Sequence, residues 1–238
     1  MKLSDRISGW LKKEVKKAGA KGVVLGLSGG IDSAVVAAIA KQACGKNVLC
    51  LIMPCENAKE DEKDAMFVAK QFGLKTRRID LSKIYRRLLS VLPRGGRSAR
   101  ANLKPRLRMA VLYYNANLLN CLVVGTGNRS EITTGYFTKY GDGGVDLIPL
   151  GAMLKKDVIK LAVELGVPSR IINKTPAAGL WEGQTDEDEM GITYRELDAI
   201  LAEAGPRFRP GIDRNNFIKV KNMVEASAHK RRLPPVFS

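Results

Sequence analysis

A short run of serine, glycine and aspartate near the N-terminus has the composition of a phosphate-binding loop. It lies between an apolar run and an alanine-rich segment and reads Ser28-Gly29-Gly30-Ile31-Asp32-Ser33. Glycines let the backbone approach a ligand closely, and free N–H groups at a helix start bind anions. The serines add hydroxyl donors. Asp32 beside phosphate requires a cation between them, and Mg²⁺ would supply it.

The alternative interpretation is an ordinary turn from a strand into a helix, with Asp32 in the first helical turn. Two serines, two glycines and an acid in this order are more specific than such a turn requires. The loop also lacks the Gly-Lys-Ser/Thr ending of a Walker A loop. We therefore predict a phosphate site of another kind.

A second polar segment follows another apolar run. It begins with Gly125-Thr126-Gly127-Asn128-Arg129-Ser130-Glu131 and continues from Gly135 to Leu150 with turn formers, charges and aromatic residues. Loops of this kind on a rigid scaffold usually carry function. The alternative is a surface loop with incidental charges.

Strands and helices that could position these loops alternate along the chain. Short apolar runs predict strands over residues 22–27, 47–53 and 121–125, and we predict a further strand over residues 74–79. Apolar residues at helical spacing predict helices over residues 3–18, 31–43, 60–72, 109–120 and 157–165. We predict an α/β fold with a doubly wound, mainly parallel, Rossmann-like sheet, helices on both faces and ligands beyond the carboxyl ends of the strands. Loops are expected over residues 92–104 and 175–191.

Composition narrows the class of protein but does not choose a partner. The chain has 238 residues, 45% of them hydrophobic, and a net charge of +16. This suits a globular protein of one large α/β domain or two small ones. The charge indicates nucleic acid, phosphorylated small molecules or only a basic surface.

The sequence also carries signals of location. No stretch approaches the ~18 apolar residues of a membrane span, and the N-terminus lacks a signal peptide. The four cysteines form no CxxC pair, and the single histidine cannot complete a usual zinc set with them. We expect a cytoplasmic protein with reduced thiols and no membrane partner.

Residues 28–33 resemble the signature of ATP pyrophosphatases with an adenine-nucleotide alpha-hydrolase-like fold, which cleave ATP to AMP and pyrophosphate. Residues 125–150 resemble, more narrowly, the signature region of ammonia-dependent NAD synthetases. The resemblance continues at Asn102, Arg106, Arg108 and Lys155 and in residues 184–187, 191–194, 197–198 and 229–231. It spans essentially the whole chain and implies a single synthetase domain over residues 1–238.

The resemblance implies ATP-dependent amidation of deamido-NAD with ammonia, which yields NAD, AMP and pyrophosphate through an adenylated intermediate. It implies ATP contacts at Gly26, Leu27, Ser28, Gly29, Gly30, Ile31, Asp32, Ser33, Thr126 and Lys155. It implies deamido-NAD contacts at Asn102, Arg106, Tyr113, Lys139, Asp146, His229 and Lys230. Asp32 and Glu131 would ligate Mg²⁺. Asp142 and Lys155 would be catalytic, Asp142 by helping to deprotonate ammonium.

Two positions depart from the family's pattern. The family usually has Thr or Ser after the proline of its Lys-x-Pro segment, whereas Pro176 is followed by Ala177. Whether the preceding Thr175 compensates is open. Pro105 stands where alanine is common and can shift the start of the following helix, because proline suits a first turn.

Two other functions compete with this one. A tRNA-modifying ATP pyrophosphatase would explain the loop and the charge together, but the chain has no CxxC pair and no added RNA-binding module. A non-catalytic nucleotide-binding protein would not need the full set of metal and phosphate residues. We therefore expect no nucleic-acid partner, and we interpret the arginine-rich residues 94–108 as a lid over phosphates rather than a nucleic-acid arm or a solvated loop.

The resemblance also implies an assembly and a nitrogen source. The family is typically homodimeric, with helices near residues 106–119 at the interface. An apolar face of Met109, Leu112, Tyr113 and Ala116 is compatible with that interface or with core. We expect no glutaminase domain, and we therefore expect the ammonia to come from outside the chain.

Overall fold

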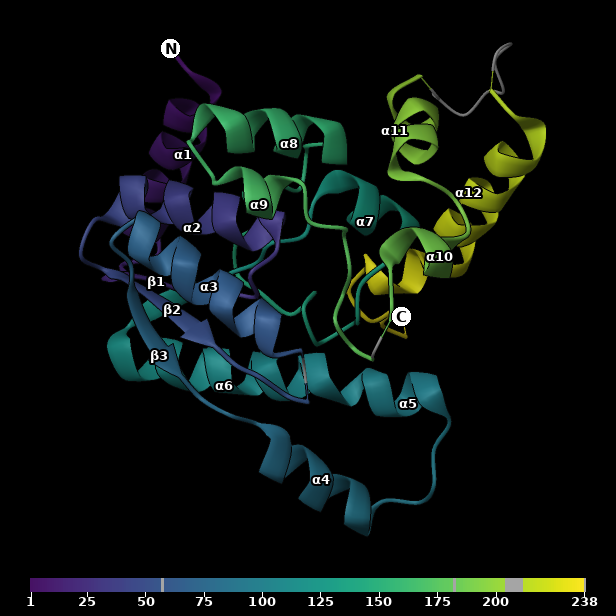
Figure 1. Ribbon diagram of the computed structural model, residues 1–238, viewed down its shortest axis with the longest axis horizontal. Helices are drawn as coiled ribbons and strands as arrows, with labels where there is room; N and C mark the ends of the chain where they lie inside the picture. Colours follow the sequence, from purple (N-terminus) through teal and green to yellow (C-terminus); the bar gives the residue numbers. More distant parts are fainter. Residues whose placement is uncertain (57, 182, 204–211, 238) are drawn as a thin grey trace.

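The computed structural model describes all residues except 57, 182, 204–211 and 238. At its centre lies a four-stranded sheet of order β3-β2-β1-β4 (Figure 1). Its strands are β1 (Gly22–Gly26), β2 (Val48–Ile52), β3 (Lys75–Arg78) and β4 (Cys121–Val124). All the pairings among these strands are parallel. The predicted doubly wound, parallel α/β sheet is confirmed.

The strand order places a topological switch point beside β1. The chain runs outward from β1 through β2 to β3 and then returns to the other side of β1 as β4. Crossovers that leave a strand in opposite directions open a crevice at its carboxyl end. The two polar loops of the sequence follow β1 and β4, so they meet at this crevice.

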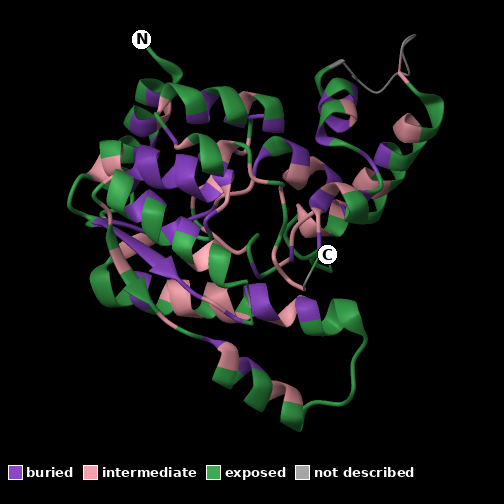
Figure 2. Cartoon of the chain, in the orientation of Figure 1, coloured by how far each residue is buried: buried purple, intermediate pink, exposed green. Residues whose placement is uncertain are grey.

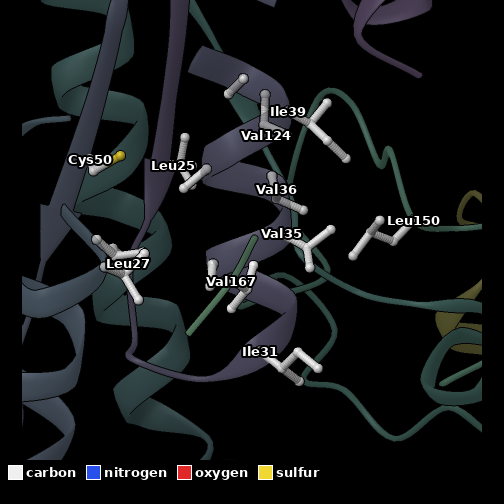
Figure 3. Close-up of a cluster of buried hydrophobic side chains, with 14 of the residues drawn as sticks. Leu25, Leu27, Ile31, Val35, Val36, Ile39, Cys50, Val124, Leu150 and Val167 are labelled. Carbon is white, nitrogen blue, oxygen red and sulfur yellow. The ribbon is translucent and has the colours of Figure 1, made fainter. Parts of the chain in front are cut away.

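One face of the sheet is covered by the helices that share the largest apolar core. They are α1 (Leu3–Lys17), α2 (Ile31–Cys44), α3 (Lys59–Gln71), α8 (Lys155–Glu164) and α9 (Ser169–Ile172). Helix α2 is rich in alanine and valine because it lies between the sheet and other helices, and most of its residues are buried. Leu25, Val35 and Leu150 are part of this core (Figure 3).

The opposite face carries a second core. The helices that contribute to it are α4 (Ser82–Val91) and α6 (Leu103–Leu119), and α5 (Arg97–Ala101) packs against α6. Val24 and Leu51 of the sheet pack with Ala116 and Leu81 on this side. Figure 2 shows the result: β1 and β2 are buried, whereas the edge strand β3 and the outer helix faces are exposed.

The C-terminal helices form a third apolar cluster beside the carboxyl edge of the sheet (Figure 1). The helices in this region are α7 (Arg129–Thr134), α10 (Asp186–Met190), α11 (Tyr194–Glu203), α12 (Arg214–Ala226) and the short 3-10 helix η1 (Ala228–Lys230). Leu154, directly before α8, packs in this cluster with Leu197 and Val220. The C-terminal helices are thereby attached to the start of α8.

Both predicted loops were wrong in part. Residues 92–104 contain α5 and the start of α6, which begins at Leu103 rather than at residue 109. Pro105 lies in the first turn of α6, where a missing N–H is tolerated. Within residues 175–191, a helix forms at Asp186–Met190 because Thr185 caps it by accepting a hydrogen bond from the N–H of Asp188. Residue 182 of that stretch lies outside the described residues.

Other sequence predictions concern the thiols and the membrane. The four cysteines are free, with Cys50 and Cys55 buried and Cys44 and Cys121 only partly so. Across the residues that the structure describes, no helix combines the length and the apolar character that crossing a membrane requires.

Candidate active site

A cavity of about 930 Å³ lies at the carboxyl ends of β1, β2 and β4. It is lined by the loop after β1, the segment after β4, one face of α6 and residues 174–181. The cavity therefore occupies the switch point at which a doubly wound sheet binds ligands.

The loop after β1 has the geometry of an anion site. Gly29 has φ +85°, and a Cβ there would lie 2.4 Å from the carbonyl oxygen of Asp61, so only glycine fits. Ser28 Oγ and Ser33 Oγ are 3.0 Å apart, and the N–H of Gly30 donates to Ser28 Oγ. The N-cap of α2 is Gly30, which has no side chain to cap the helix, so the first amides of α2 can face a ligand. Of residues 26–33, all but Gly29 line the cavity.

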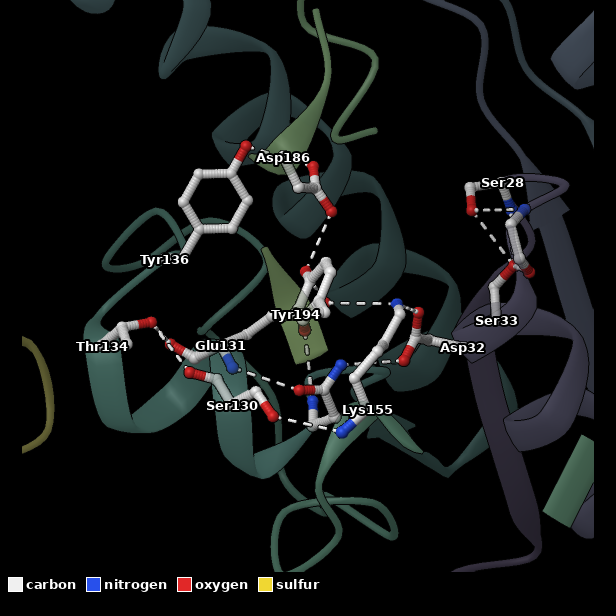
Figure 4. A network of polar contacts seen from close by, with 12 residues as sticks. Ser28, Asp32, Ser33, Ser130, Glu131, Thr134, Tyr136, Lys155, Asp186 and Tyr194 are labelled. Carbon is white, nitrogen blue, oxygen red and sulfur yellow. Dashed lines mark hydrogen bonds and ion pairs between the residues drawn. The ribbon is translucent and has the colours of Figure 1, made fainter. Parts of the chain in front are cut away.

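Asp32, Glu131 and Lys155 meet beside this loop (Figure 4). Lys155 Nζ lies 2.5 Å from Asp32 Oδ2 and 3.9 Å from Glu131 Oε1. Burial alone would lower the pKa of Lys155, but the two carboxylates outweigh it and raise that pKa. Burial, with the nearby charge of Asp32, raises the pKa of Glu131 to about 8. Two acids crowded in a buried site create a strong demand for positive charge.

A set of tyrosines and acids extends the network toward α10. Tyr194 donates to Asp186 Oδ2 at 3.0 Å. The Tyr136 hydroxyl lies 3.1 Å from Asp186 Oδ1 and 2.8 Å from Glu189 Oε2, and its single hydrogen is donated to one of these acids at a time. Asp186 is buried, which raises its pKa. Tyr136, Asp186 and Glu189 line the cavity. Sequence reasoning gave these residues no role, although residues 184–187 belonged to the resemblance.

Asn128 is a further residue that sequence reasoning missed. It is buried and begins α7 with a capping box. The Asn128 side chain accepts from the N–H of Glu131, and the Glu131 side chain accepts from the N–H of Asn128. Its amide also donates to Asp32 at 2.9 Å. The signal was present, because an Asn three residues before a Glu is the spacing of a capping box.

The remaining predicted residues fall into two groups. Asn102, Thr126, Asp142 and Lys230 line the cavity. Arg106, Tyr113, Lys139, Asp146 and His229 are absent from that lining.

The residues outside the lining are connected to one another. Arg106 donates to the carbonyl oxygen of Lys139, whose Nζ donates to the carbonyl oxygen of His229 at 2.6 Å. Tyr113 donates to Asp146 at 2.9 Å. They therefore form two linked groups. One consists of Arg106, Lys139 and His229, and the other consists of Tyr113 and Asp146.

Asp142 is exposed to solvent on its own loop, although protein atoms crowd around its carboxyl group. It accepts a hydrogen bond of 2.9 Å from the N–H of Thr138. Desolvation raises its pKa, while that hydrogen bond and the charges of Lys230 and Arg108 act in the opposite direction. A carboxylate with a raised pKa is a better acceptor of a proton.

Residues 175–181 close part of the cavity from the side of α5 and α6. The buried Lys104 donates to the carbonyl oxygen of Leu180 at 2.8 Å, and the Arg97 guanidinium lies 5.8 Å from the ring centre of Trp181. Thr175 and Ala177 both line the cavity. The arginine-rich segment thus contacts a cover over the predicted phosphate site.

The donor set fits a metal ion only together with a ligand. Among the residues described, no group of three or more His, Cys, Asp or Glu side chains could hold a metal ion. Mg²⁺ is usually bound by one or two carboxylates with phosphate oxygens and water. Asp32 and Glu131 converge on a cation already, the Lys155 ammonium. Their hard oxygens suit Mg²⁺ beside a nucleotide phosphate.

A doubly wound sheet with a phosphate loop, paired carboxylates and a buried lysine at its switch point defines a nucleotide-binding α/β enzyme. Comparison with known proteins narrows this class. A family model described as NAD synthase matches residues 3–234. The NH(3)-dependent NAD(+) synthetase of Archaeoglobus fulgidus is 50% identical over 99% of this chain and 96% of its own. That of Carboxydothermus hydrogenoformans is 47% identical over 98% and 96%.

Solved structures share the fold over almost the whole chain. The NMN synthetase of Francisella tularensis superimposes with a TM-score of 0.92 at 37% identity, over 98% of this chain and 96% of that one. The NH3-dependent NAD synthetase of Campylobacter jejuni, in complex with nitrate, gives a TM-score of 0.81 at 29% identity, over 99% and 97%.

The chain therefore belongs to the NAD synthase family. It is an ATP-dependent ligase that forms NAD from deamido-NAD with ammonia as the nitrogen donor. This decides between the functions considered from the sequence, and the tRNA-modifying alternative is set aside.

Proposed function

We propose that the cavity at the switch point first adenylates the nicotinate carboxylate of deamido-NAD and then passes the activated acyl group to ammonia. The observation that carries this proposal is the convergence of Asp32, Glu131 and Lys155 beside a phosphate loop. A carboxylate is a poor electrophile because ammonia would attack an anion. Attack of the carboxylate on the α-phosphorus of ATP releases pyrophosphate and gives an acyl adenylate, from which ammonia displaces AMP.

The ATP half of the site is assigned to the loop of residues 26–33 with Thr126 and Lys155. The amides at the start of α2 and the hydroxyls of Ser28 and Ser33 donate to phosphate oxygens. Lys155 is a buried cation at the edge of that loop and offsets the charge that develops during phosphoryl transfer. This assignment is supported by the cavity wall, because every residue assigned to ATP except Gly29 lines the same cavity.

We assign Mg²⁺ to Asp32 and Glu131. When bound, the ion would neutralise phosphate charge and stabilise the leaving pyrophosphate. The two carboxylates hold their positions through α2 and α7, which are far apart in the sequence. This assignment also explains the acid in the phosphate loop, because Mg²⁺ would lie between Asp32 and the phosphate.

The deamido-NAD half is assigned to Asn102, Arg106, Tyr113, Lys139, Asp146, His229 and Lys230. Asn102 and Lys230 line the cavity, and the others form the two linked groups outside it. Lys230 donates to the carbonyl oxygens of Gly135 and Phe137 and so fixes the C-terminal segment against the loop before Asp142. The C-terminal segment would then cover the dinucleotide.

Asp142 is assigned to the ammonia step. Desolvation by the surrounding protein atoms raises the pKa of Asp142, so its carboxylate accepts a proton more readily than a free one. Removing a proton from ammonium produces the ammonia that attacks the acyl carbon.

We further propose a single domain over residues 1–238, a homodimer and a cytoplasmic location. Met109 and Leu112 line the cavity and Ala116 lies in the second core, so that face of α6 is occupied within the chain. Tyr114 and Leu118 on the same helix are 69% and 63% exposed and offer an apolar surface to a second copy. Sedimentation at micromolar concentration should give a dimer, and a monomer alone would contradict this proposal.

The proposed cytoplasmic location rests on two observations, the use of ATP as a substrate and the four free thiols.

Nicotinate mononucleotide is a second candidate substrate. The structural relative with a TM-score of 0.92 is named an NMN synthetase. Five of the seven residues assigned to deamido-NAD lie outside the cavity lining of this chain. A cavity that reaches the nicotinate end through Asn102 and Lys230 could accept a substrate without the adenylate half.

Steady-state kinetics with the two substrates distinguish these candidates. The kcat/KM values for deamido-NAD and nicotinate mononucleotide are measured with saturating ATP, Mg²⁺ and ammonium. We expect deamido-NAD to be preferred at least about tenfold, which corresponds to 1.4 kcal/mol of extra binding in the transition state. Replacing His229 and Lys230 with alanine should raise KM for deamido-NAD more than KM for ATP. A preference for the mononucleotide would support the second candidate instead.

A further inference from the structure

Asn128 contacts both carboxylates of the proposed metal pair from a position that is 0% exposed. It stands between β4 and α7 and begins the latter helix. Its amide Nδ2 donates to Asp32 Oδ1 at 2.9 Å, and its backbone N–H donates to Glu131 Oε2 at 3.2 Å. It therefore joins an acid on α2 to an acid on α7.

Chemistry fixes the orientation of the Asn128 amide. The backbone N–H of Glu131 points at Asn128 Oδ1 from 3.1 Å, and an N–H can only donate. The amide oxygen must face Glu131, which leaves the NH₂ group facing Asp32. The capping box thus closes the start of α7 and also aims a donor at a carboxylate 96 positions earlier in the chain.

Lys155 also reaches both carboxylates, but a cation competes with a metal ion for them. The amide of Asn128 is neutral and does not compete. Asn128 binds Oδ1 of Asp32, whereas Lys155 binds Oδ2. The hydrogen bond from Asn128 can therefore persist whether Lys155 or a metal ion neutralises Asp32 and Glu131.

We infer that Asn128 is a positioning residue that holds Asp32 and Glu131 in the arrangement that binds a divalent cation. This inference rests on the metal role proposed for the two acids. Groups that orient metal ligands typically change metal affinity about 10- to 100-fold when they are lost. Asn128 meets the conditions for such a group: it is buried, fully oriented and bonded to both ligands.

Manganese binding tests the inference in a way that activity does not. Mn²⁺ serves as the spectroscopic probe, and its affinity is measured by electron paramagnetic resonance with a non-hydrolysable ATP analogue. The variants are Asn128→Ser and Asn128→Thr, which keep a capping oxygen for α7 but are too short to reach Asp32. Asp32→Asn tests the metal pair itself.

A matched control separates positioning from loss of a helix cap. Asp213 caps α12 by accepting from the N–H of Asn216 at 2.8 Å, and it does not contact the acids of the pair. Asp213→Ala therefore removes a cap alone. Melting temperatures are recorded for every variant.

We expect the two Asn128 variants to bind Mn²⁺ about 10- to 100-fold more weakly than the wild type. The Mg²⁺ concentration for half-maximal activity should rise in parallel, with kcat largely recovered at saturating Mg²⁺. Wild-type affinity in both Asn128 variants, beside a defective Asp32→Asn, would overturn this inference and leave the proposed metal pair intact. Weakening no greater than in Asp213→Ala would overturn it too. Wild-type affinity in Asp32→Asn would refute the metal pair and the inference together.

Discussion

The ion pair between Lys155 and Asp32 should stabilise the ligand-free protein, and replacing Lys155 with methionine tests this. The methionine keeps much of the apolar stem and removes the charge. Asp32 would then face Glu131 without the shared cation that now lies 2.5 Å from one acid and 3.9 Å from the other.

The structure sets the expected magnitude. Removing one partner of a fully buried pair costs about 3–5 kcal/mol. The side chain of Lys155 is 4% exposed but that of Asp32 is 16% exposed and faces the cavity, so solvent screens part of the effect. We expect Lys155→Met to lower the free energy of unfolding by about 3 kcal/mol. For a chain of this size the melting temperature should fall by about 6–12 °C.

A double-mutant cycle with Asp32→Asn isolates the pair. Urea unfolding without nucleotide or metal gives the free energy for the wild type, both single variants and the double variant. Asp32→Asn should cost less than Lys155→Met, because Lys155 keeps Glu131 as a partner. We expect a coupling energy of about 2 kcal/mol, within the range for contacting residues. Additive single effects, with coupling below about 0.5 kcal/mol, would refute the ion pair.

Three further variants test single positions of the site. Gly29→Ala should weaken ATP binding more than tenfold in calorimetry, because an alanine Cβ would meet the Asp61 carbonyl oxygen at 2.4 Å, and an unchanged affinity would contradict the loop geometry. Asp142→Asn should abolish NAD formation yet raise the melting temperature, because desolvation raises the folded pKa of Asp142, so its carboxylate costs stability as pH rises through that pKa. A lower melting temperature with retained activity would argue against this. Wild-type activity should accordingly fall as pH falls through the same pKa. Lys104→Met should speed proteolysis at residues 175–181 and raise KM for ATP more than it lowers kcat, since the bond to Leu180 is lost, whereas unchanged cleavage would show that this bond does not hold the cover.

Local patterns in the sequence predicted most of the scaffold. The strands and the helices around them follow from apolar periodicity, which is decided within a few residues of each position. The start of α6 was placed at residue 109 rather than at Leu103, although Pro105 suits a first helical turn. Helix α4 was missed although its apolar residues gather on one face, which is a local signal that the sequence carries.

The site divides in the same way. Residues 28–33 were predicted because a phosphate loop is a continuous segment whose chemistry can be read in order. The contact of Asn128 with Asp32 joins positions 96 apart, and no spacing rule reaches that far. Likewise, Arg108 lines the cavity and Arg106 does not. This difference depends on which face of α6 meets the sheet. Those placements need the folded chain.

The most direct test of the proposed site is an NAD-formation assay with ATP, Mg²⁺ and deamido-NAD, run in parallel with ammonium or glutamine and with Asp32→Ala beside the wild type. We predict one AMP and one pyrophosphate for each NAD, formed with ammonium but not with glutamine and lost in the variant. NAD formation that survives Asp32→Ala, or ATP cleavage to ADP in place of AMP, would contradict adenylation at this cavity.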